Sequence, residues 1–298
     1  MSKDKSGIKY FFMAFAVTAV VLAIVFVPIY LTVIPMAGMN STETEVESKA
    51  EKPSKISYTP NKNDRLNILI GLTDDTDRLI TVYLCRLYPQ KQSIPATSLP
   101  AETLFQSNDE LITLEHQYSQ NGMLGLCDAV SGMLNIEVDK YAKISKNDFI
   151  SIVNYIGSIE YFIPENLVYE NKEQNIYINI PKGIQNLDGE RLYTLITFPQ
   201  FSDTLFKHKL YTDIISSYIN LRLDEWYMNN IDSVFAFIVN NSESNISVID
   251  HAQYKKPFLY TITSGNNVGV GVFLNFDEVE NGVRISKESF DMIDVYFK

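Results

Sequence analysis

Residues 180–210 read IPKGIQNLDGERLYTLITFPQFSDTLFKHKL, and the rest of the chain is best understood from this run. Residues 181–183 interrupt a strand and residues 186–189 form a second turn, because Pro, Gly, Asn and Asp favour turns. Glu190 then opens an amphipathic helix whose apolar positions carry leucine and isoleucine. The second half, residues 197–210, is mostly apolar or neutral, with basic side chains only near its end.

Upstream of this run, short apolar segments alternate with helical patterns. Residues 66–72 (LNILIGL) and 79–87 (LITVYLCRL) have the continuous apolar character of buried strands. Residues 121–134 have helical spacing, and Ser145 is suited to cap a second helix that stops at Gly157. Four further segments have strand-like patterns, at 93–99, 140–144, 159–163 and 174–180.

Downstream, residues 203–222 predict a long helix and residues 226–239 predict another. Strand-like pieces follow at 258–263, 268–275 and 293–297. The alternation of strands and helices predicts an α/β or α+β domain. Residues 226–298 either complete this domain or form a small extension.

The N-terminal segment has the pattern of a membrane anchor. Residues 1–9 carry three lysines, and residues 10–36 are uncharged and strongly apolar. About 20 such residues cross a bilayer, whereas the apolar core of a signal peptide has about 7–15. We therefore expect a cytoplasmic tail, a single membrane helix and an outside domain, with a cleaved signal peptide as the alternative. Residues 37–63 are polar and predict a flexible stalk.

Composition narrows the class of protein. The chain has 298 residues, a formal net charge of −11 and a sequence pI of about 4.8. This acidic balance argues against nucleic acid as a partner, because such partners need a basic face. Cys85 and Cys127 lack the spacing of a metal site, and we interpret them as buried thiols. A disulfide between them is the alternative if the domain lies outside the cell.

Carboxylates between the first two strands are the clearest candidate for chemistry. Asp74, Asp75 and Asp77 lie on one strand connection, where oxygen ligands suit Mg²⁺. Acidic residues in turns are also common as turn formers alone. The chain has neither a nucleophile elbow nor a phosphate-binding glycine loop, and its histidines are isolated from one another (His116, His208 and His251).

Five short motifs occur in a fixed order within residues 64–225. They are NILIG at 67–71, DRLITV at 77–82, SLPAET at 98–103, YAKI followed by FISIVNYIG at 141–157, and GIQNLDGE at 183–190. In this order, after an apolar N-terminal helix and a stalk, they resemble the LytR–CpsA–Psr (LCP) family of Gram-positive cell-envelope proteins.

This resemblance implies both a fold and an activity. The fold is a single extracytoplasmic α/β domain with a central mixed β-sheet flanked by helices. The activity is transfer of an anionic glycopolymer from a polyprenyl pyrophosphate carrier to peptidoglycan, with the lipid tail in an apolar pocket and Mg²⁺ and arginines on the pyrophosphate. The implied partners are the membrane, the carrier-linked glycopolymer or peptidoglycan, and other envelope proteins, but not nucleic acid.

Only some of the site residues that the family motifs contain are present at the matching positions of this chain. Asp77 matches the metal-side aspartate of the family, with Asp75 as a second expected Mg²⁺ ligand. The arginine of the motif Pro-Arg-Asp-Thr is Ala101 here, and its aspartate is Glu102.

The family's later arginines are also replaced. An Arg-x-Arg pair falls on Thr197 and Pro199, and an Arg-x-x-Arg-Gln motif falls near Lys209. Lysine does not reproduce the bidentate fork that arginine offers to phosphate. The residues expected at catalytic positions are Asp77, Glu102 and Lys209, and those expected to bind substrate are Arg78, Lys207 and His208.

Three hypotheses follow. The first is a degenerate family member that binds a lipid-linked polymer without turnover, because the replaced arginines are those that perform the chemistry. The second is an active Mg²⁺-dependent phosphotransferase that uses a displaced set of basic residues. The third is a membrane-anchored envelope sensor, for which a nine-residue cytoplasmic tail is short.

Overall fold

The computed structural model describes residues 57–107, 110–201, 204–263 and 267–298. The chain divides into two compact units, Met1–Lys52 and Pro53–Lys298, and all described residues belong to the second. The expected cytoplasmic tail, the expected membrane helix at 10–36 and most of the expected stalk lie outside the described residues. Within the described ranges, no helix is both long and apolar enough to cross a membrane.

A six-stranded mixed sheet forms the centre of the second unit, in the order β11-β6-β1-β2-β3-β12. The β1–β2, β2–β3 and β6–β11 pairs are antiparallel, whereas β1–β6 and β3–β12 are parallel. Continuous apolar runs form the central strands because helices cover both faces of the sheet. The strands are β1 (Leu66–Thr73), β2 (Leu79–Leu87), β3 (Ile94–Pro100), β6 (Lys140–Ile144), β11 (Glu243–Ser244) and β12 (Gly269–Gly271).

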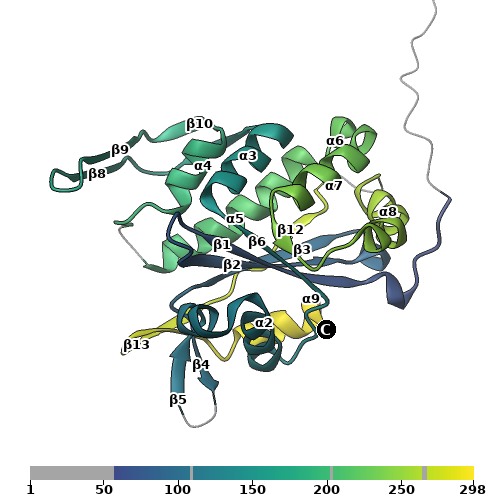
Figure 1. Ribbon diagram of the computed structural model, residues 1–298, viewed down its shortest axis with the longest axis horizontal. Helices are drawn as coiled ribbons and strands as arrows, with labels where there is room; N and C mark the ends of the chain where they lie inside the picture. The colour runs from purple at the N-terminus through teal and green to yellow at the C-terminus, as the bar shows by residue number, and fades with distance from the viewer. Residues whose placement is uncertain (1–56, 108–109, 202–203, 264–266) are drawn as a thin grey trace, which may run out of the picture. The chain divides into compact units, whose positions relative to one another are not determined.

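Helices cover the sheet in two layers (Figure 1). One face carries α3 (Lys146–Ile156), α4 (Gly189–Ile196) and α5 (Thr204–Arg222), and the opposite face carries α2 (Leu114–Leu134) and α9 (Ser289–Phe297). Because successive strand side chains point to opposite faces, each strand contributes to both cores. Leu69 and Val82 pack with α2 and α9, whereas Leu72 and Tyr83 pack with α3, α4 and α5.

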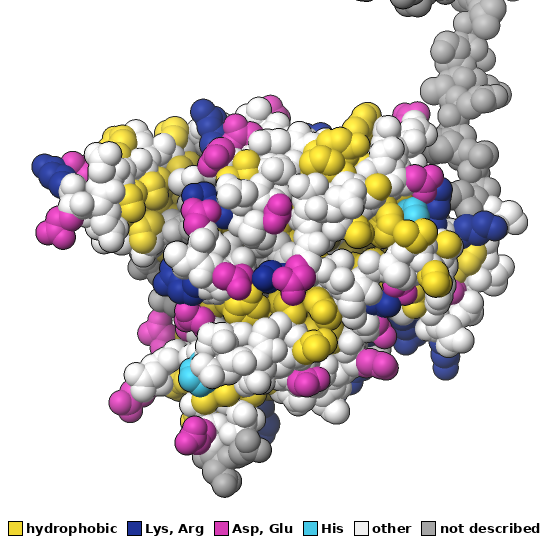
Figure 2. All heavy atoms as spheres, viewed as in Figure 1, with side chains coloured by type: hydrophobic (Ala, Val, Ile, Leu, Met, Phe, Trp, Pro, Cys, Tyr) yellow, Lys and Arg dark blue, Asp and Glu magenta, His cyan; other side chains and the backbone are white. Residues whose placement is uncertain are grey.

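Smaller elements surround this centre. Hairpins form from β4 (Leu104–Ser107) and β5 (Glu110–Thr113), from β8 (Leu167–Asn171) and β9 (Ile176–Ile180), and from β13 (Phe276–Val279) and β14 (Gly282–Ile285). Strand β7 (Ile159–Ile163) pairs with β10 (Gly183–Leu187). The other helical elements are η1 (Lys62–Asp64), η2 (Pro89–Lys91), α6 (Glu225–Asn229), α7 (Ile231–Asn240) and α8 (Val248–Thr263). Figure 2 shows hydrophobic side chains gathered over the β8–β9 hairpin, where Val168 and Tyr177 are exposed.

Local signals set the boundaries of several of these elements. The Ser145 side chain accepts a hydrogen bond from the backbone N–H of Asp148, and Gly157 ends α3 with a φ of 128°, as expected for a cap and a stop. Asp188 caps α4 in the same way by accepting from the N–H of Arg191 at 2.9 Å. The sequence pattern was wrong for residues 186 and 187, which belong to strand β10 rather than to a turn.

Two expected strands are helices. Residues 258–263 form the end of α8, and residues 293–297 lie in α9. A short apolar run occurs both in strands and in buried helices. The shortness of the apolar runs at these two positions therefore wrongly favoured strands. The helix expected at 121–134 begins earlier, at Leu114, and is broken at Gly122, whose φ is 61°. The helix expected at 226–239 is divided at Asn230 into α6 and α7.

Residues after 226 take part in the same sheet and core. Strand β12 pairs in parallel with β3, and β11 adds an edge beside β6. Ile293 and Phe297 of α9 are buried in the cluster that contains α2.

Candidate functional site

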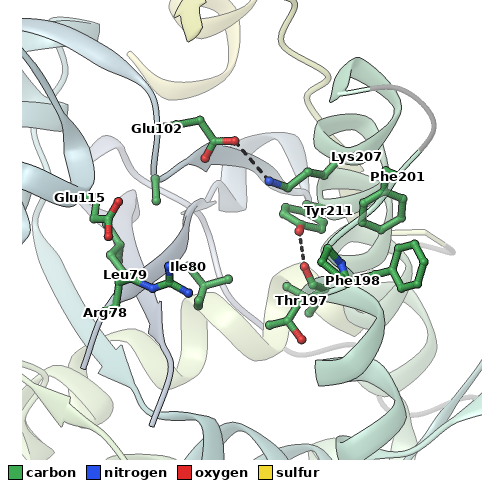
Figure 3. Close-up of a pocket in the computed structure, with 13 residues that line it drawn as sticks. Arg78, Leu79, Ile80, Glu102, Glu115, Thr197, Phe198, Phe201, Lys207 and Tyr211 are labelled. Carbon is green, nitrogen blue, oxygen red and sulfur yellow. Dashed lines mark hydrogen bonds and ion pairs between the residues drawn. The ribbon is translucent and has the colours of Figure 1, made fainter. Parts of the chain in front are cut away.

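A cavity of about 460 Å³ lies where five separate segments of the chain meet, one of which is the start of α2 with Glu115. The start of β2 contributes Arg78, and the segment after β3 contributes Ala101 and Glu102. The loop after α4 and the first turns of α5 form the opposite wall, which includes Lys207 and Tyr211 (Figure 3).

An ion pair joins two of these segments. The Nζ atom of Lys207 lies 3.2 Å from Oε1 of Glu102, and about a third of each side chain is exposed. The same ammonium lies 5.8 Å from the ring centroid of Tyr211, one helical turn later. The hydroxyl of Tyr211 donates to the carbonyl of Ile196 at the end of α4, which fixes α5 against α4. These contacts hold the Lys207 ammonium at the cavity wall.

Arg78 supplies the second cation. Its Nε atom donates to Oδ2 of Asp74 at 3.1 Å, and 63% of its side chain is exposed. Glu115 lies on the same side of the cavity (Figure 3). The charged lining residues are therefore two cations, Arg78 and Lys207, and two carboxylates, Glu102 and Glu115, so their formal charges cancel.

Three neutral residues line the positions where arginines were expected. Ala101 comes from the segment after β3, and Thr197 and Pro199 follow α4, yet all three face the same cavity. The motif positions are far apart in the sequence, and the fold brings them together. Because none of the three side chains carries charge, this wall provides no bidentate donor for a phosphate.

An apolar cavity of about 130 Å³ lies between the sheet and helices α3, α4 and α5. Aliphatic and aromatic side chains line it, including Leu72, Tyr83, Phe149 and Ile214. Ile196 lines both this cavity and the charged one. A ligand with an anionic group and an apolar chain could therefore contact both across this one side chain.

The carboxylates expected to hold Mg²⁺ lie in a different hollow, of about 370 Å³. Asp75 pairs with Lys146 at 2.8 Å. Asp77 has a φ of 60°, pairs with Lys143 at 3.3 Å and accepts a hydrogen bond from the hydroxyl of Tyr118 at 2.8 Å.

These carboxylates do not fit an open magnesium site. Lys143 is also 2.8 Å from Glu243, and this hydrogen bond, together with the negative charge of Asp77, raises the pKa of the lysine, against the opposite effect of burial. Each expected ligand therefore faces a charged ammonium. Within the described ranges, no group of three or more His, Cys, Asp or Glu side chains is placed to hold a metal ion.

The structure separates the six expected catalytic and substrate-binding residues. Arg78, Glu102 and Lys207 share the charged cavity, whereas Asp77 lines the neighbouring hollow. Lys209 is exposed and His208 is buried, with its ring 5.0 Å from that of Phe276, and neither residue lines the cavity.

Sequence reasoning missed Tyr211 and Glu115. Tyr211 lies four residues after Lys207, and this helical spacing could have indicated it. Glu115 had no comparable signal, because its approach to Arg78 depends on where α2 starts.

Comparison with known proteins gives three kinds of match. The model of the LytR_cpsA_psr family matches residues 32–203. An uncharacterized protein of Staphylococcus aureus (strain NCTC 8325 / PS 47) is 20% identical over 303 residues, which covers 97% of this chain and 74% of the relative.

Solved structures share the fold. A protein of Eubacterium siraeum DSM 15702, described as a transcription regulator, has a TM-score of 0.74 and 19% identity, covering 88% of this chain and 98% of the other. TagV of B. subtilis has a TM-score of 0.58 and 18% identity, with 78% and 95% covered. TagT bound to LIIa-WTA has a TM-score of 0.58 and 17% identity, with 83% and 95% covered.

Proposed function

The chain belongs to the LytR_cpsA_psr family, and from this membership we propose that it binds a polyprenyl pyrophosphate-linked glycopolymer at the cell envelope without transferring it. Family membership supports a role related to cell-envelope glycopolymers. The finer proposal is that the charged cavity receives the pyrophosphate and the apolar cavity receives the start of the lipid tail.

One observation carries this proposal, namely that the charged residues lining the cavity cancel one another. Phosphoryl transfer needs preorganised donors on the oxygens where charge develops, and removing one such donor costs about 3 kcal/mol. Ala101 and Pro199 have no side-chain donor, and the hydroxyl of Thr197 donates to the carbonyl of Tyr193 at 2.9 Å. The loss of several donors would slow transfer by many orders of magnitude.

The replacement of the arginines should weaken binding of the lipid-linked glycopolymer less than it slows its transfer. Burial of a lipid chain contributes about 0.8 kcal/mol per CH₂ group, independently of any arginine. The apolar cavity beside Ile196 offers such burial. Structures of the same fold include TagT bound to LIIa-WTA and to LI-WTA, where WTA denotes wall teichoic acid, and this supports a glycopolymer as the ligand class.

An active transferase is the second candidate, because Arg78 and Lys207 both reach the charged cavity. It would require Mg²⁺ to bind with the phosphates. Since Asp75 and Asp77 are both paired with lysines, one of those ion pairs would first have to open.

A transfer assay separates the two candidates. The full chain in detergent would be mixed with a fluorescent polyprenyl pyrophosphate-linked glycan and Mg²⁺, with an arginine-complete family member alongside. We expect binding of the glycan without release of the carrier. Metal-dependent release at a rate comparable to that of the arginine-complete protein would overturn the proposal.

Two lysine variants test the location of binding. Lys207→Met removes the cation that lines the cavity, and we expect glycan affinity to fall at least ~10-fold, because a charge-assisted contact contributes about 1.5–3 kcal/mol. Lys209→Met is the matched control, since this lysine is exposed on the same helix outside the cavity. Equal losses in the two variants would place binding elsewhere.

We also propose that residues 10–36 anchor the chain in the cell membrane, with the N-terminus in the cytoplasm and the folded domain outside. The uncharged, apolar character of this segment supports the proposal. Protease added to intact protoplasts should remove the domain. Protection of the domain until the cells are lysed would contradict this topology.

A further inference from the structure

Another cavity, separate from the three described above, lies at the end of the β1–β2 ladder remote from Arg78. Asn67 pairs with Arg86 at this end, whereas Thr73 pairs with Leu79 at the other. Asn67 and Thr73 are six positions apart along the strand, which corresponds to about 20 Å. The cavity has a volume of about 580 Å³, and its polar lining includes Lys62, Arg65, Asn67, Arg86, Glu137 and Asp139.

Both of these paired strand residues line this cavity, and each has a buried polar atom that is unsatisfied within the described residues. Arg86 and Asn67 are each only 5% exposed. Nη1 of Arg86 donates to the carbonyl of Tyr296 at 3.5 Å, but its Nε atom has no hydrogen-bond partner among the described residues. Oδ1 of Asn67 is likewise without a donor within the described ranges. Buried polar atoms are normally satisfied, so each of these two residues leaves a hydrogen-bonding position unfilled beside the cavity.

Three cations surround one buried aromatic ring beside the cavity. The Cζ atoms of Arg65 and Arg86 lie 4.5 Å and 4.9 Å from the ring centroid of Tyr88, and Nζ of Lys91 lies 5.0 Å from it. In the described part of the chain, no carboxylate forms an ion pair with any of the three. Asp139 is engaged instead by the backbone N–H of Asn67, at 2.7 Å.

This cluster is unusual in a chain whose formal net charge is −11. A buried charge without a counter-ion is costly, and a protein normally supplies a partner for it. Burial, followed by repulsion from Arg65, lowers the pKa of Arg86, and the opposite effect of Tyr88 and of the negative charge of Asp139 is too small to restore it. An anion that entered the cavity would relieve both effects.

We propose that this cavity binds a phosphate group, either as inorganic phosphate or as a soluble phosphate ester. Guanidinium groups match phosphate oxygens with two parallel hydrogen bonds, and two guanidinium groups balance a dianion better than a monocarboxylate. The amide nitrogen of Asn67 donates to the carbonyls of Glu137 and Phe297, so Oδ1 is left as the acceptor. That acceptor suits the P–OH of hydrogen phosphate.

Calorimetric titration of the full chain with inorganic phosphate, at constant ionic strength, tests this proposal. We expect Arg86→Met to weaken phosphate binding at least ~10-fold, because the variant removes a charge-assisted bidentate contact. Without phosphate, Arg86→Met should be as heat-stable as the unmodified chain or more so, since a buried unpaired charge is removed. If Arg86→Met does not fold, Arg65→Gln, at a half-buried residue, should weaken binding in the same direction.

The double variant Arg78→Gln with Lys207→Gln is the control, since it removes both cations of the first cavity. Phosphate affinity that survives in this control and falls in Arg86→Met supports the proposal. Affinity that is lost in the control, or is unchanged in Arg86→Met, overturns it.

Titration with glycerol 3-phosphate distinguishes the two sources of the phosphate group. Tighter binding than that of inorganic phosphate identifies an ester as the ligand, and weaker binding identifies the free anion. Absence of binding by both overturns the proposal, whereas the proposed glycopolymer function would be unaffected.

Discussion

Gly189 is the position in residues 180–210 where a single methyl group should have the largest effect. This residue begins α4, and its N–H donates to Oδ1 of Asn154 on α3 at 2.9 Å. A Cβ atom built on Gly189 would lie 2.4 Å from the carbonyl oxygen of Ile150, 2.7 Å from its Cα and 2.9 Å from its carbonyl carbon. All three atoms belong to the backbone of α3, so no side-chain rotation can relieve the overlap.

The change in the free energy of unfolding expected for Gly189→Ala is the sum of two opposing effects. To reach even 3.0 Å, the oxygen of Ile150 must retreat by about 0.6 Å (3.0 minus 2.4), which separates α3 from α4. Overpacking of this kind costs about 1–3 kcal/mol, and a rigid backbone contact belongs at the upper end. Alanine recovers up to about 1 kcal/mol through its helix propensity. We therefore expect Gly189→Ala to lower the free energy of unfolding by about 2 kcal/mol.

Gly132→Ala is the matched control, because Gly132 lies within α2 and a Cβ there would meet no atom within 4 Å. We expect this variant to gain up to about 1 kcal/mol from helix propensity and reduced freedom of the unfolded chain. Urea unfolding followed by circular dichroism measures both changes. A Gly189→Ala variant within about 0.5 kcal/mol of the unmodified chain, the ordinary range of surface substitutions, would refute the close approach of the two helices.

Three further predictions use the same unfolding assay or a chemical probe. Tyr118→Phe removes the hydroxyl that donates to Asp77 at 2.8 Å, and should cost about 1–2 kcal/mol; an unchanged urea midpoint would contradict this bond. Burial tends to raise the pKa of Asp74, but its four hydrogen bonds outweigh burial and lower it, so Asp74→Asn should cost about 2 kcal/mol near neutral pH. That cost should disappear as the pH falls through the lowered pKa of the folded state, and a cost that is independent of pH would exclude the carboxylate as its source. Burial raises the pKa of Cys85 to about 12 and that of Cys127 to about 11, so alkylation of the native chain near pH 8 should be slow at both and slower at Cys85. Mass spectrometry of the labelled chain measures this order, which unfolding should abolish.

Local sequence signals predicted the centre of the fold well. Strands β1 and β2 are buried by helices on both sides, so their apolar runs are continuous and their limits are clear. Ser145 and Gly157 marked the ends of α3 because a side-chain cap and a glycine stop with positive φ are local chemistry. Helix α9 was missed because five apolar-rich residues are too few to show a helical period.

Of the residues expected at the site, only some lie around the candidate cavity, and the reason is geometric. Lys207 faces the cavity but Lys209 does not, since two residues along a helix rotate a side chain by about 200°. The lysines that neutralise the turn carboxylates come from β6 and α3, more than 60 residues away. No pattern within the turn itself could have indicated those partners, so Asp75 and Asp77 were expected to be open to a metal.

The parallel pairing of β12 with β3 has a consequence for biosynthesis. Residues 269–271 close one edge of the sheet, and residues 289–297 fill the core beneath it, although β1, β2 and β3 are synthesised some 170 residues earlier. During translation, the nascent three-stranded meander must therefore wait with an open strand edge and with an apolar face that α2 covers only in part, which are features that favour aggregation. The domain reaches its final packing only after nearly all of its chain has emerged, so a chaperone that holds this intermediate should raise the yield of folded protein.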